Sequence, residues 1–403
     1  MMYGQTITQN AQYTFKYNSS LGRHGWLRLT PAYSVHLVEE ILADLDYTPR
    51  CVMEPFSGTG TTELVCANKG IPSFALEINP FLVWLGNAKL NYYPTDKIEE
   101  FLSAANDLME NIDELKPAKL PPIYNIYRWW SPSKAEFLAR LKTAIQDIED
   151  KDVSQLFTVA FCRIIIELSN AAFNHVSTSF KDNCDDIFSL EAAKESYLQI
   201  CHMVAQGAIS QPRAASKVML HDSRSVPAEY IGEYDTVITS PPYPNRMSYI
   251  RELRPYMYWL DYLETPEQAS DLDWRAIGGT WGRATTLLGT WKSSHSLPQY
   301  VYDIAGKIER ADNKSAGLMA NYVMKYFEDM YQHLSSAYAG LKLKGKAFYI
   351  IGNSNFYNVT VPAEEIYCDM MREIGFNDVE YRIVRKRNCN KQLYEFVVTG
   401  QKM

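Results

Sequence analysis

A strand, a glycine-rich turn and the start of a helix are predicted by the segment Cys51-Val52-Met53-Glu54-Pro55-Phe56-Ser57-Gly58-Thr59-Gly60-Thr61-Thr62. Gly58 and Gly60 allow positive φ and close backbone approach, and residues 61–68 have a helical composition. The free N–H groups at the start of such a helix would face a ligand. The segment is neither a Rossmann Gly-x-Gly-x-x-Gly nor a P-loop, because Thr61, Thr62 and Glu63 follow Gly60 and no Gly-Lys-Ser/Thr closes the turn.

Further strands along the chain end in acidic residues. Residues 71–77 predict a short strand that ends in Glu77, about 20 residues beyond the first glycine, the spacing at which an acid reaches ribose hydroxyls. Residues 217–220 predict another strand, which ends in His221-Asp222. Ligand-binding side chains in open α/β sheets lie at the carboxyl ends of strands. The pattern therefore predicts an α/β fold with a nucleotide-like ligand at that edge.

A further apolar run, Thr236-Val237-Ile238, leads into Thr239-Ser240-Pro241-Pro242-Tyr243. Two successive prolines cannot continue a central strand, because neither supplies an N–H to the ladder. The chain must turn there and leave Ser240, two carbonyls and the Tyr243 ring at the end of a strand. A hydroxyl and a carbonyl accept hydrogen bonds from an amino group, and an aromatic ring stacks on a flat base. This segment predicts a pocket for a planar, amine-bearing ring.

Together these segments resemble the S-adenosylmethionine-dependent DNA amino-methyltransferases, in particular the Ser-Pro-Pro-Tyr branch that methylates the exocyclic N4 of cytosine. The resemblance covers most of the chain outside two insertions. It implies a Rossmann-like methyltransferase sheet, mostly parallel, with a C-terminal antiparallel hairpin at about residues 379–399. The cofactor motif, residues 54–62, precedes the catalytic tetrad, residues 240–243 (Ser-Pro-Pro-Tyr), in this chain. Many members of the N4-cytosine branch have the reverse, permuted order.

The resemblance also implies S-adenosyl-L-methionine as cofactor and assigns site residues. The segment 26–33 is similar to the motif that closes over the methionine end of the cofactor. Glu54 stands where aspartate is commoner, Glu77 where the family binds ribose, and Asp222 where it binds the adenine amino group. The expected cofactor-binding residues are Thr30, Pro31, Glu54, Pro55, Phe56, Gly58, Gly60, Thr61, Thr62, Glu77 and Asp222, and the expected catalytic residues are Ser240, Pro241, Pro242 and Tyr243.

The chemistry expected at the tetrad is methyl transfer to an aromatic amine. Hydrogen bonds from the amino group to the Ser240 hydroxyl and the Pro241 carbonyl would pull the nitrogen toward tetrahedral geometry, and positioning would carry most of the acceleration. The base must leave the duplex, and Tyr243 would stack on it, which is worth about 1–3 kcal/mol. Methylation at cytosine C5 needs a cysteine nucleophile, usually after proline, and none of the seven cysteines follows a proline, which argues against that class.

Three alternatives stay open at this point. Family members that act on adenine N6 more often carry Asp or Asn before Pro-Pro-Tyr, so Ser240 favours cytosine. Related tetrads also serve guanine N2 in RNA, although no appended RNA-binding module is evident. The third alternative is an inactive nucleic-acid-binding homologue, against which the intact tetrad and both glycines argue.

Basic and aromatic residues predict where DNA binds. No Asp or Glu occurs between Asp273 and Asp303, and we expect the insertion at residues 265–320 to be a DNA-contact loop that becomes ordered on binding. A second basic group, Arg246, Arg251 and Arg254, lies at the start of the helix after the tetrad. A third, which includes Arg387, lies near the tip of the C-terminal hairpin. The expected DNA-binding residues are Arg246, Arg251, Arg254, Arg275, Trp281, Arg283, Lys292 and Arg387.

The catalytic domain is expected to comprise residues 1–90 and 216–403, interrupted by a helical subdomain at residues 91–215. That stretch is too long for a loop, and its composition predicts helices at 97–115, 133–149, 153–172 and 190–206. Within it, residues 124–130 form an aromatic cluster that we interpret as a staple docking one helix on another.

Composition sets the remaining expectations. The net charge is −7 and the pI about 5.6, but DNA binding requires only local positive potential. No apolar stretch approaches 18 residues and the N-terminus lacks a signal-peptide core, so no membrane association is expected. The cysteines form no Cys-x-x-Cys pair, so neither a metal site nor a disulfide framework is expected. We expect a cytoplasmic enzyme whose partners are double-stranded DNA and a restriction endonuclease of the same system.

Overall fold

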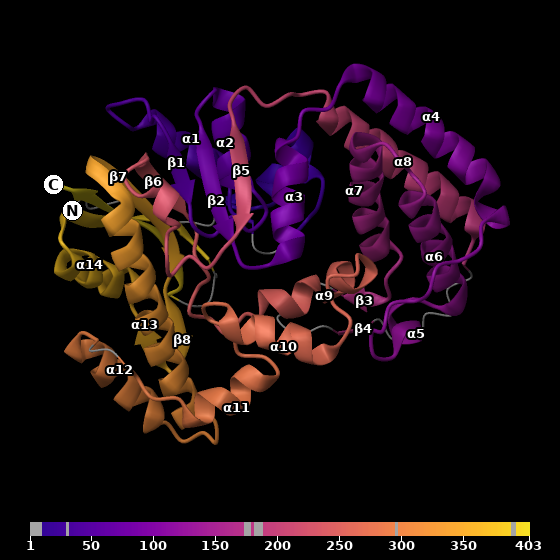
Figure 1. The fold of residues 1–403 in the computed structure, drawn as a ribbon. Helices are drawn as coiled ribbons and strands as arrows, with labels where there is room; N and C mark the ends of the chain where they lie inside the picture. Colours follow the sequence, from indigo (N-terminus) through magenta and orange to yellow (C-terminus); the bar gives the residue numbers. More distant parts are fainter. Residues whose placement is uncertain (1–9, 30–31, 173–178, 181–187, 295–296, 388–391) are drawn as a thin grey trace.

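The computed structural model describes residues 10–29, 32–172, 179–180, 188–294, 297–387 and 392–403. Its main sheet has seven strands in the order β10-β11-β7-β6-β1-β2-β5 (Figure 1). Strands β7, β6, β1, β2 and β5 are parallel, and β11 runs antiparallel between β7 and β10. This is the Rossmann-like methyltransferase sheet with a C-terminal antiparallel hairpin that the sequence predicts. The strands are β1 Val52–Glu54, β2 Ser73–Glu77, β5 Ser216–Leu220, β6 Tyr234–Thr239, β7 Leu341–Gly352, β10 Phe376–Lys386 and β11 Tyr394–Lys402.

The central strands are apolar on both faces because helices cover both sides of the sheet. Consecutive residues of a strand point to opposite faces, so Val52 and Ile238 pack on α1 and α2, whereas Met53 and Val237 pack in the core that contains α13 and α14. Each of these four side chains is fully buried. The helices are α1 Val35–Ala43, α2 Thr61–Lys69, α3 Pro80–Leu90, α13 Ala316–Gly340 and α14 Ala363–Ile374.

The strand order changes direction at β1. From β1 the chain moves outward through β2 to β5 and then returns to form β6 on the other side of β1. Such a switch point leaves a crevice outside the carboxyl ends of the strands, which is where open α/β sheets bind ligands. The glycine turn after β1 and the Ser240 segment after β6 thus lie next to each other.

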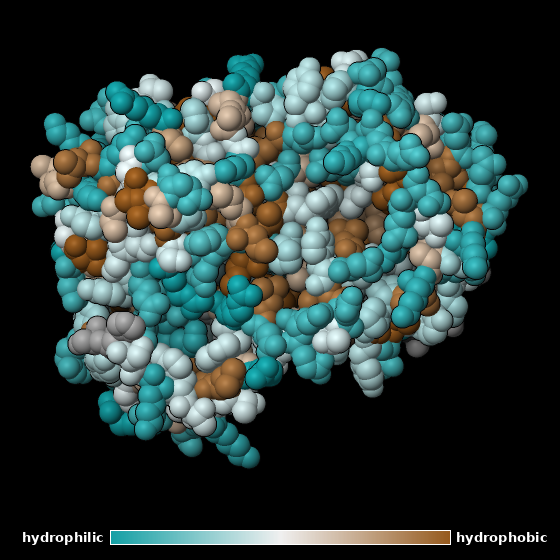
Figure 2. Space-filling model, in the orientation of Figure 1, coloured by the Kyte–Doolittle hydropathy of each residue, from teal (hydrophilic) through white to brown (hydrophobic). Residues whose placement is uncertain are grey.

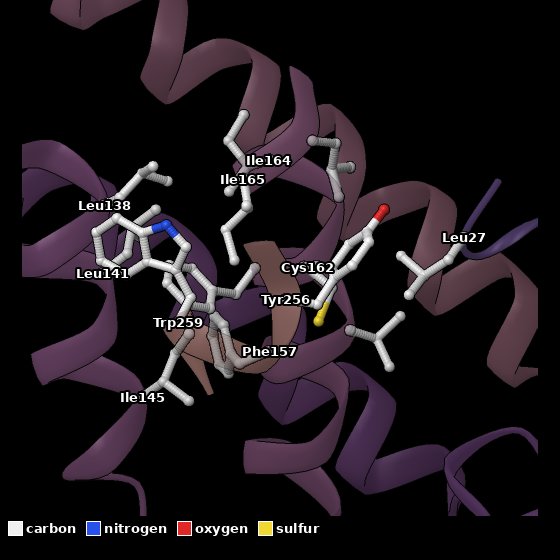
Figure 3. Close-up of a cluster of buried hydrophobic side chains, with 14 of the residues drawn as sticks. Leu27, Leu138, Leu141, Ile145, Phe157, Cys162, Ile164, Ile165, Tyr256 and Trp259 are labelled. Atoms are coloured by element: carbon white, nitrogen blue, oxygen red, sulfur yellow. The ribbon is translucent and has the colours of Figure 1, made fainter. Parts of the chain in front are cut away.

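The described helices between α3 and β5 form the helical part at the right of Figure 1. Its helices share one core with α9 (Tyr249–Trp259), the helix after the tetrad: the ring centroids of Trp259 and Trp130 are 5.6 Å apart, and those of Trp259 and Phe161 are 5.8 Å apart. Figure 3 shows Trp259 and Tyr256 among side chains of these helices. The helical part is therefore anchored directly behind the tetrad. Its helices are α4 Thr95–Asn111, α5 Ile126–Trp129, α6 Pro132–Gln146, α7 Lys151–Glu167 and α8 Leu190–Ala208.

The prediction of a loop at residues 265–320 is wrong. The segment contains α10 (Pro266–Arg275), α11 (Arg283–Thr290), α12 (Gln299–Glu309) and the start of α13. A capping box starts α10, because the Thr265 hydroxyl accepts from the Gln268 N–H while the Gln268 side chain accepts from the Thr265 N–H. Ala284 and Leu288 bury one side of α11. Local capping and an apolar helix face thus favour helices in the described residues of this segment, and its contact with DNA stays a prediction.

The remaining elements are short. Two-stranded pairs join β3 (Ala171–Ala172) to β4 (Ser179–Phe180) and β8 (Ser354–Phe356) to β9 (Val359–Val361). The 3₁₀ helices are η1 Ala11–Tyr13, η2 Tyr17–Ser20, η3 Gly22–Gly25, η4 Ile112–Glu114 and η5 Ala228–Tyr230. On the face shown in Figure 2 most side chains are hydrophilic, and apolar ones gather toward the middle of the view. None of the helices in the described part of the chain has the length and apolar character that crossing a membrane requires.

Candidate active site

A cavity of about 420 Å³ lies at the carboxyl ends of the strands. It is lined by the ends of β1, β2, β5 and β6, by residues of α9 and α10, and by the C-terminal hairpin. A single space therefore joins the predicted cofactor turn to the predicted tetrad. Of the residues expected from sequence, those that line the cavity are Pro55, Phe56, Gly58, Glu77, Asp222, Ser240, Pro241, Pro242, Tyr243, Arg275 and Arg387.

The two glycines of the turn have different positions. Gly58 lines the cavity with φ 53°, and its N–H donates to Glu77 Oε2 over 2.9 Å. Gly60 lies below the wall with φ 75°, as the N-cap of α2. A Cβ on Gly60 would come within 3.3 Å of the Gly86 Cα on α3. Gly58 therefore shapes the cavity, whereas Gly60 lets α2 approach α3.

Glu77 ends β2 with its carboxylate at the cavity. Its Oε1 accepts the Asn79 N–H over 2.8 Å while Oε2 accepts that of Gly58. Burial raises the pKa of Glu77 to about 7, although the N–H donors act against this shift. Two backbone bonds fix the carboxylate and leave it lone pairs, so it can accept hydrogen bonds from hydroxyl groups in the cavity.

Glu54 does not reach the cavity wall. It is fully buried behind the glycine turn and accepts hydrogen bonds from Tyr33 Oη over 2.7 Å, Thr62 Oγ1 over 2.9 Å and the Phe56 N–H over 2.9 Å, as well as from Thr239 Oγ1. Burial, with the nearby Glu63, raises the pKa of Glu54 well above its ordinary value. Glu54 thus joins β1, α2 and the end of β6, and its part in cofactor binding stays a prediction. Gly60, Thr61 and Thr62 likewise do not line the cavity, and their part in cofactor binding also stays a prediction.

Asp222 lines the cavity, but its carboxylate is already paired. Arg224 Nη2 lies 2.6 Å from Asp222 Oδ2, and Arg224 Nη1 lies 2.9 Å from Asp329 Oδ1. Burial raises the pKa of Asp222, but hydrogen bonds from Arg224 outweigh this effect and the pKa is lowered. An adenine amino group would therefore have to share this carboxylate with Arg224, an arrangement that the sequence does not predict.

The N-terminal segment contributes aromatic rings to the cavity. Tyr13, Phe15 and Tyr33 line it. Trp26 is fully buried and its Nε1 donates to the Val204 carbonyl of α8 over 3.2 Å, which fixes the segment to the helical part. The two expected contacts Thr30 and Pro31 lie outside the described residues.

The tetrad begins with Ser240, the residue that follows the last residue of β6. Tyr326 Oη donates to the Pro242 carbonyl over 2.7 Å, so that carbonyl already has a partner. No donor from the described residues bonds the carbonyl of Pro241, which lines the cavity beside Ser240. Ser240 Oγ and the Pro241 carbonyl are the two acceptors that the sequence predicts for the amine.

Tyr243 is held from the C-terminal hairpin. Its Oη donates to Glu395 Oε1 over 2.8 Å, and Arg385 Nε donates to Glu395 Oε2 over 2.7 Å. The Arg387 guanidinium lies 4.9 Å from the Tyr243 ring centroid, and its Nη1 donates to the Asn353 carbonyl over 2.9 Å. Arg387 is therefore not an exposed group at a hairpin tip, and one face of the ring on which the base was expected to stack is covered.

Sequence reasoning missed Arg385 and Glu395. They line the cavity although they lie about 150 residues beyond Tyr243, and only the sheet order brings them beside β7 and the tetrad. Asn79, another lining residue, lies two residues beyond the Glu77 strand end and could have been found there.

The other expected DNA-binding residues differ in their exposure to solvent. Arg246, Arg283 and Lys292 are exposed, and Arg283 pairs with the exposed Asp271 over 2.6 Å. The Arg254 guanidinium lies 4.5 Å from the Trp281 ring centroid, so these two side chains cover each other. The remaining member of the helix group, Arg251, is half-buried. Among the described residues no group of three or more His, Cys, Asp or Glu could hold a metal ion.

No family model matches the chain. Its sequence is 21% identical to the type II methyltransferase M.BsoBI of Geobacillus stearothermophilus, over 94% of this chain and 83% of the relative. The chain is similar to type II methyltransferases. The type II methyltransferase M.MvaI of Kocuria varians is 20% identical to this chain, over 83% of this chain and 76% of its own length. These similarities agree with the predicted cofactor, S-adenosylmethionine.

Proposed function

We propose that this protein is a DNA methyltransferase that transfers a methyl group from S-adenosylmethionine to the exocyclic N4 amine of cytosine in double-stranded DNA. One observation carries the proposal: Ser240 and Pro241, with their amine-accepting oxygens, line the same cavity as the Gly58 turn and Glu77. The similarity to two type II methyltransferases supports methyl transfer to DNA in a restriction–modification system. Such a system pairs the enzyme with a cognate endonuclease, the partner that we propose.

The cavity residues fit the cofactor. Glu77 supplies a fixed carboxylate for the ribose hydroxyls, and Phe56 supplies an apolar ring for the adenine. Gly58 lets the backbone come close, and Asp222 would hold the adenine amino group together with Arg224. When bound, the cofactor supplies an electrophilic methyl group on a cationic sulfur.

Ser240 and Pro241 then determine the geometry of the amine. The lone pair of an aromatic amine is delocalised into its ring, so the nitrogen is a weak nucleophile. Two acceptors held off the ring plane would draw the amino hydrogens toward them and return the lone pair to the nitrogen. This preorganisation requires no covalent enzyme intermediate. A serine before Pro-Pro-Tyr, where the adenine enzymes more often have Asp or Asn, favours cytosine.

The target base reaches this cavity only after it leaves the duplex, which costs a few kcal/mol. Because Arg387 covers one face of Tyr243, we propose that the flipped base uses the other face or displaces the guanidinium. Arg246, Arg283 and Lys292 are the exposed cations that we propose as phosphate contacts. Such local contacts are sufficient for DNA binding despite the overall negative charge.

The variant Ser240→Ala tests the proposal. It should lower methyl transfer to DNA by about 10²-fold or more, the range typical of a lost preorganised hydrogen bond, and leave the affinity for S-adenosylmethionine nearly unchanged. The exposed Ser19 provides the matched control, Ser19→Ala, which should retain full activity. Equal losses of turnover and cofactor affinity in Ser240→Ala would contradict the role assigned to this hydroxyl.

A further inference from the structure

A directed row of hydrogen bonds leads from the tetrad into the hairpin. Ser240 Oγ donates to Tyr243 Oη over 3.5 Å, and Tyr243 Oη donates to Glu395 Oε1 over 2.8 Å. All three side chains line the cavity. With its own hydrogen directed to Tyr243, the Ser240 oxygen keeps its lone pairs for a hydrogen of the substrate amine.

Methyl transfer to an amine creates an excess proton. The nitrogen that gains a methyl group also gains a positive charge, and the neutral methylamine product forms only when one N–H proton leaves. A serine hydroxyl cannot keep this proton, since it is a very weak base. The reaction therefore requires an acceptor beyond Ser240.

We propose that Ser240, Tyr243 and Glu395 form a relay that removes this proton, with the Glu395 carboxylate as its terminal acceptor. The inference rests on the proposed function. As the N–C bond forms and the C–S bond breaks, the sulfur keeps the electron pair of that bond. The amine proton passes to Ser240 Oγ, the serine proton passes to Tyr243 Oη, and the tyrosine proton passes to Glu395. The N-methylated base is left neutral, both hydroxyls regain a proton, and Glu395 later releases one proton to water.

The surroundings of Glu395 suit this role. Its side chain is 6% exposed, so solvent has little access to it. Arg385 donates to it from Nε and Nη2, over 2.7 and 3.2 Å, which fixes the position of the carboxylate. Burial, with the nearby Glu395, raises the pKa of Tyr243 well above its ordinary value, so the phenol holds its proton until another arrives.

The energetics favour transfer in this direction. An aromatic amine that has become cationic is a far stronger acid than a carboxylic acid, because losing the proton restores conjugation with the ring. A carboxylate such as that of Glu395 can therefore accept this proton. The 3.5 Å separation of Ser240 and Tyr243 is long for a hydrogen bond, and catalytic hydrogen bonds commonly shorten once substrate is bound.

Tyr243→Phe distinguishes a relay from a stacking role. It keeps the ring but removes the hydroxyl, so stacking alone predicts wild-type behaviour. The relay predicts a fall of ~10²-fold or more in the single-turnover rate of cytosine methylation, within the range of general acid–base contributions. Glu395→Gln should show a similar fall, because an amide oxygen accepts the tyrosine hydrogen bond but does not take its proton. The matched controls are Tyr381→Phe and Glu380→Gln, which change exposed residues of the same hairpin.

Binding and isotope measurements separate the relay from a structural effect. Affinities for S-adenosylmethionine and duplex DNA, and the melting temperature, should be near wild type in both relay variants. The wild-type rate should fall in D₂O, and this solvent isotope effect should be lost in Tyr243→Phe. A Tyr243→Phe protein with the wild-type rate, or one whose rate and affinities fall together, would overturn the relay. A wild-type protein that labels no exocyclic amine in DNA would refute the proposed function itself, and the relay with it.

Discussion

Replacement of Glu77 by glutamine should weaken cofactor binding and remove its dependence on pH. In the structure the two carboxylate oxygens accept the N–H groups of Gly58 and Asn79, over 2.9 and 2.8 Å. Glutamine has one acceptor oxygen, and its NH₂ group would face one of these N–H donors. The change therefore disturbs the glycine turn and removes the charge that would bind the ribose hydroxyls.

The magnitude follows from the hydrogen bonds at stake. A hydrogen bond to a charged group contributes about 1.5–3 kcal/mol, so the loss of one should weaken cofactor affinity by roughly 10- to 150-fold. Burial raises the pKa of Glu77 to about 7, and hydroxyl donors bind the ionised form better. Wild-type affinity should therefore rise as the pH increases through 7, whereas the affinity of Glu77→Gln should stay flat.

Calorimetric titration with S-adenosylmethionine at about pH 6 and about pH 8 measures both effects and the proton release linked to binding. Glu229→Gln is the matched control, because it makes the same change at an exposed residue and should bind like the wild type. An affinity of Glu77→Gln close to wild type, or the same pH dependence in both proteins, would refute the cofactor role of this carboxylate.

Three further variants test other parts of the account. Arg283→Ala should weaken DNA binding equally for all sequences and lower the salt slope by about 1; an unchanged slope means that Arg283 contacts no phosphate. Gly352→Ala should lower methyl transfer with cofactor affinity retained, because the added Cβ would clash with Arg387 Nη1 and lie 2.9 Å from Tyr243 Cδ2; full activity in this variant would show that the ring and guanidinium need no fixed position. Glu63 is fully buried, and burial raises its pKa to about 7. The Glu63 carboxyl therefore binds its proton more tightly in the folded protein than in the unfolded chain, and the protein loses stability as the pH rises from about 4.5 through 7. Glu63→Gln should therefore stabilise the protein by up to about 3 kcal/mol at alkaline pH and hardly at all below pH 4.5. Denaturant titrations that show the same stabilisation in the alkaline and the acidic range would contradict this.

The parts of the site that depend on local chain geometry could be predicted from sequence. Gly58 and Gly60 both have positive φ, and the double proline places Ser240 at the end of β6, because neither feature tolerates a regular strand or helix. The order of motifs also predicts that Glu77 and Ser240 meet at one edge of the sheet.

The parts that depend on packing between distant segments could not be predicted. An acid at a strand end predicts a cavity contact, but Glu54 turns inward because Tyr33, Thr62 and Thr239 offer it buried hydroxyl donors. Similarly, the sequence around Arg387 gives no sign that Tyr243 will lie beneath its guanidinium.

The identity of the methylated nucleoside tests the central claim most directly. The protein would be incubated with labelled S-adenosylmethionine and mixed genomic DNA, and the DNA would then be digested and its labelled nucleosides identified. We predict N4-methylcytosine. N6-methyladenine would keep the fold and the cofactor site but contradict the assignment of Ser240 to cytosine. An absence of label in DNA would contradict the proposed substrate altogether.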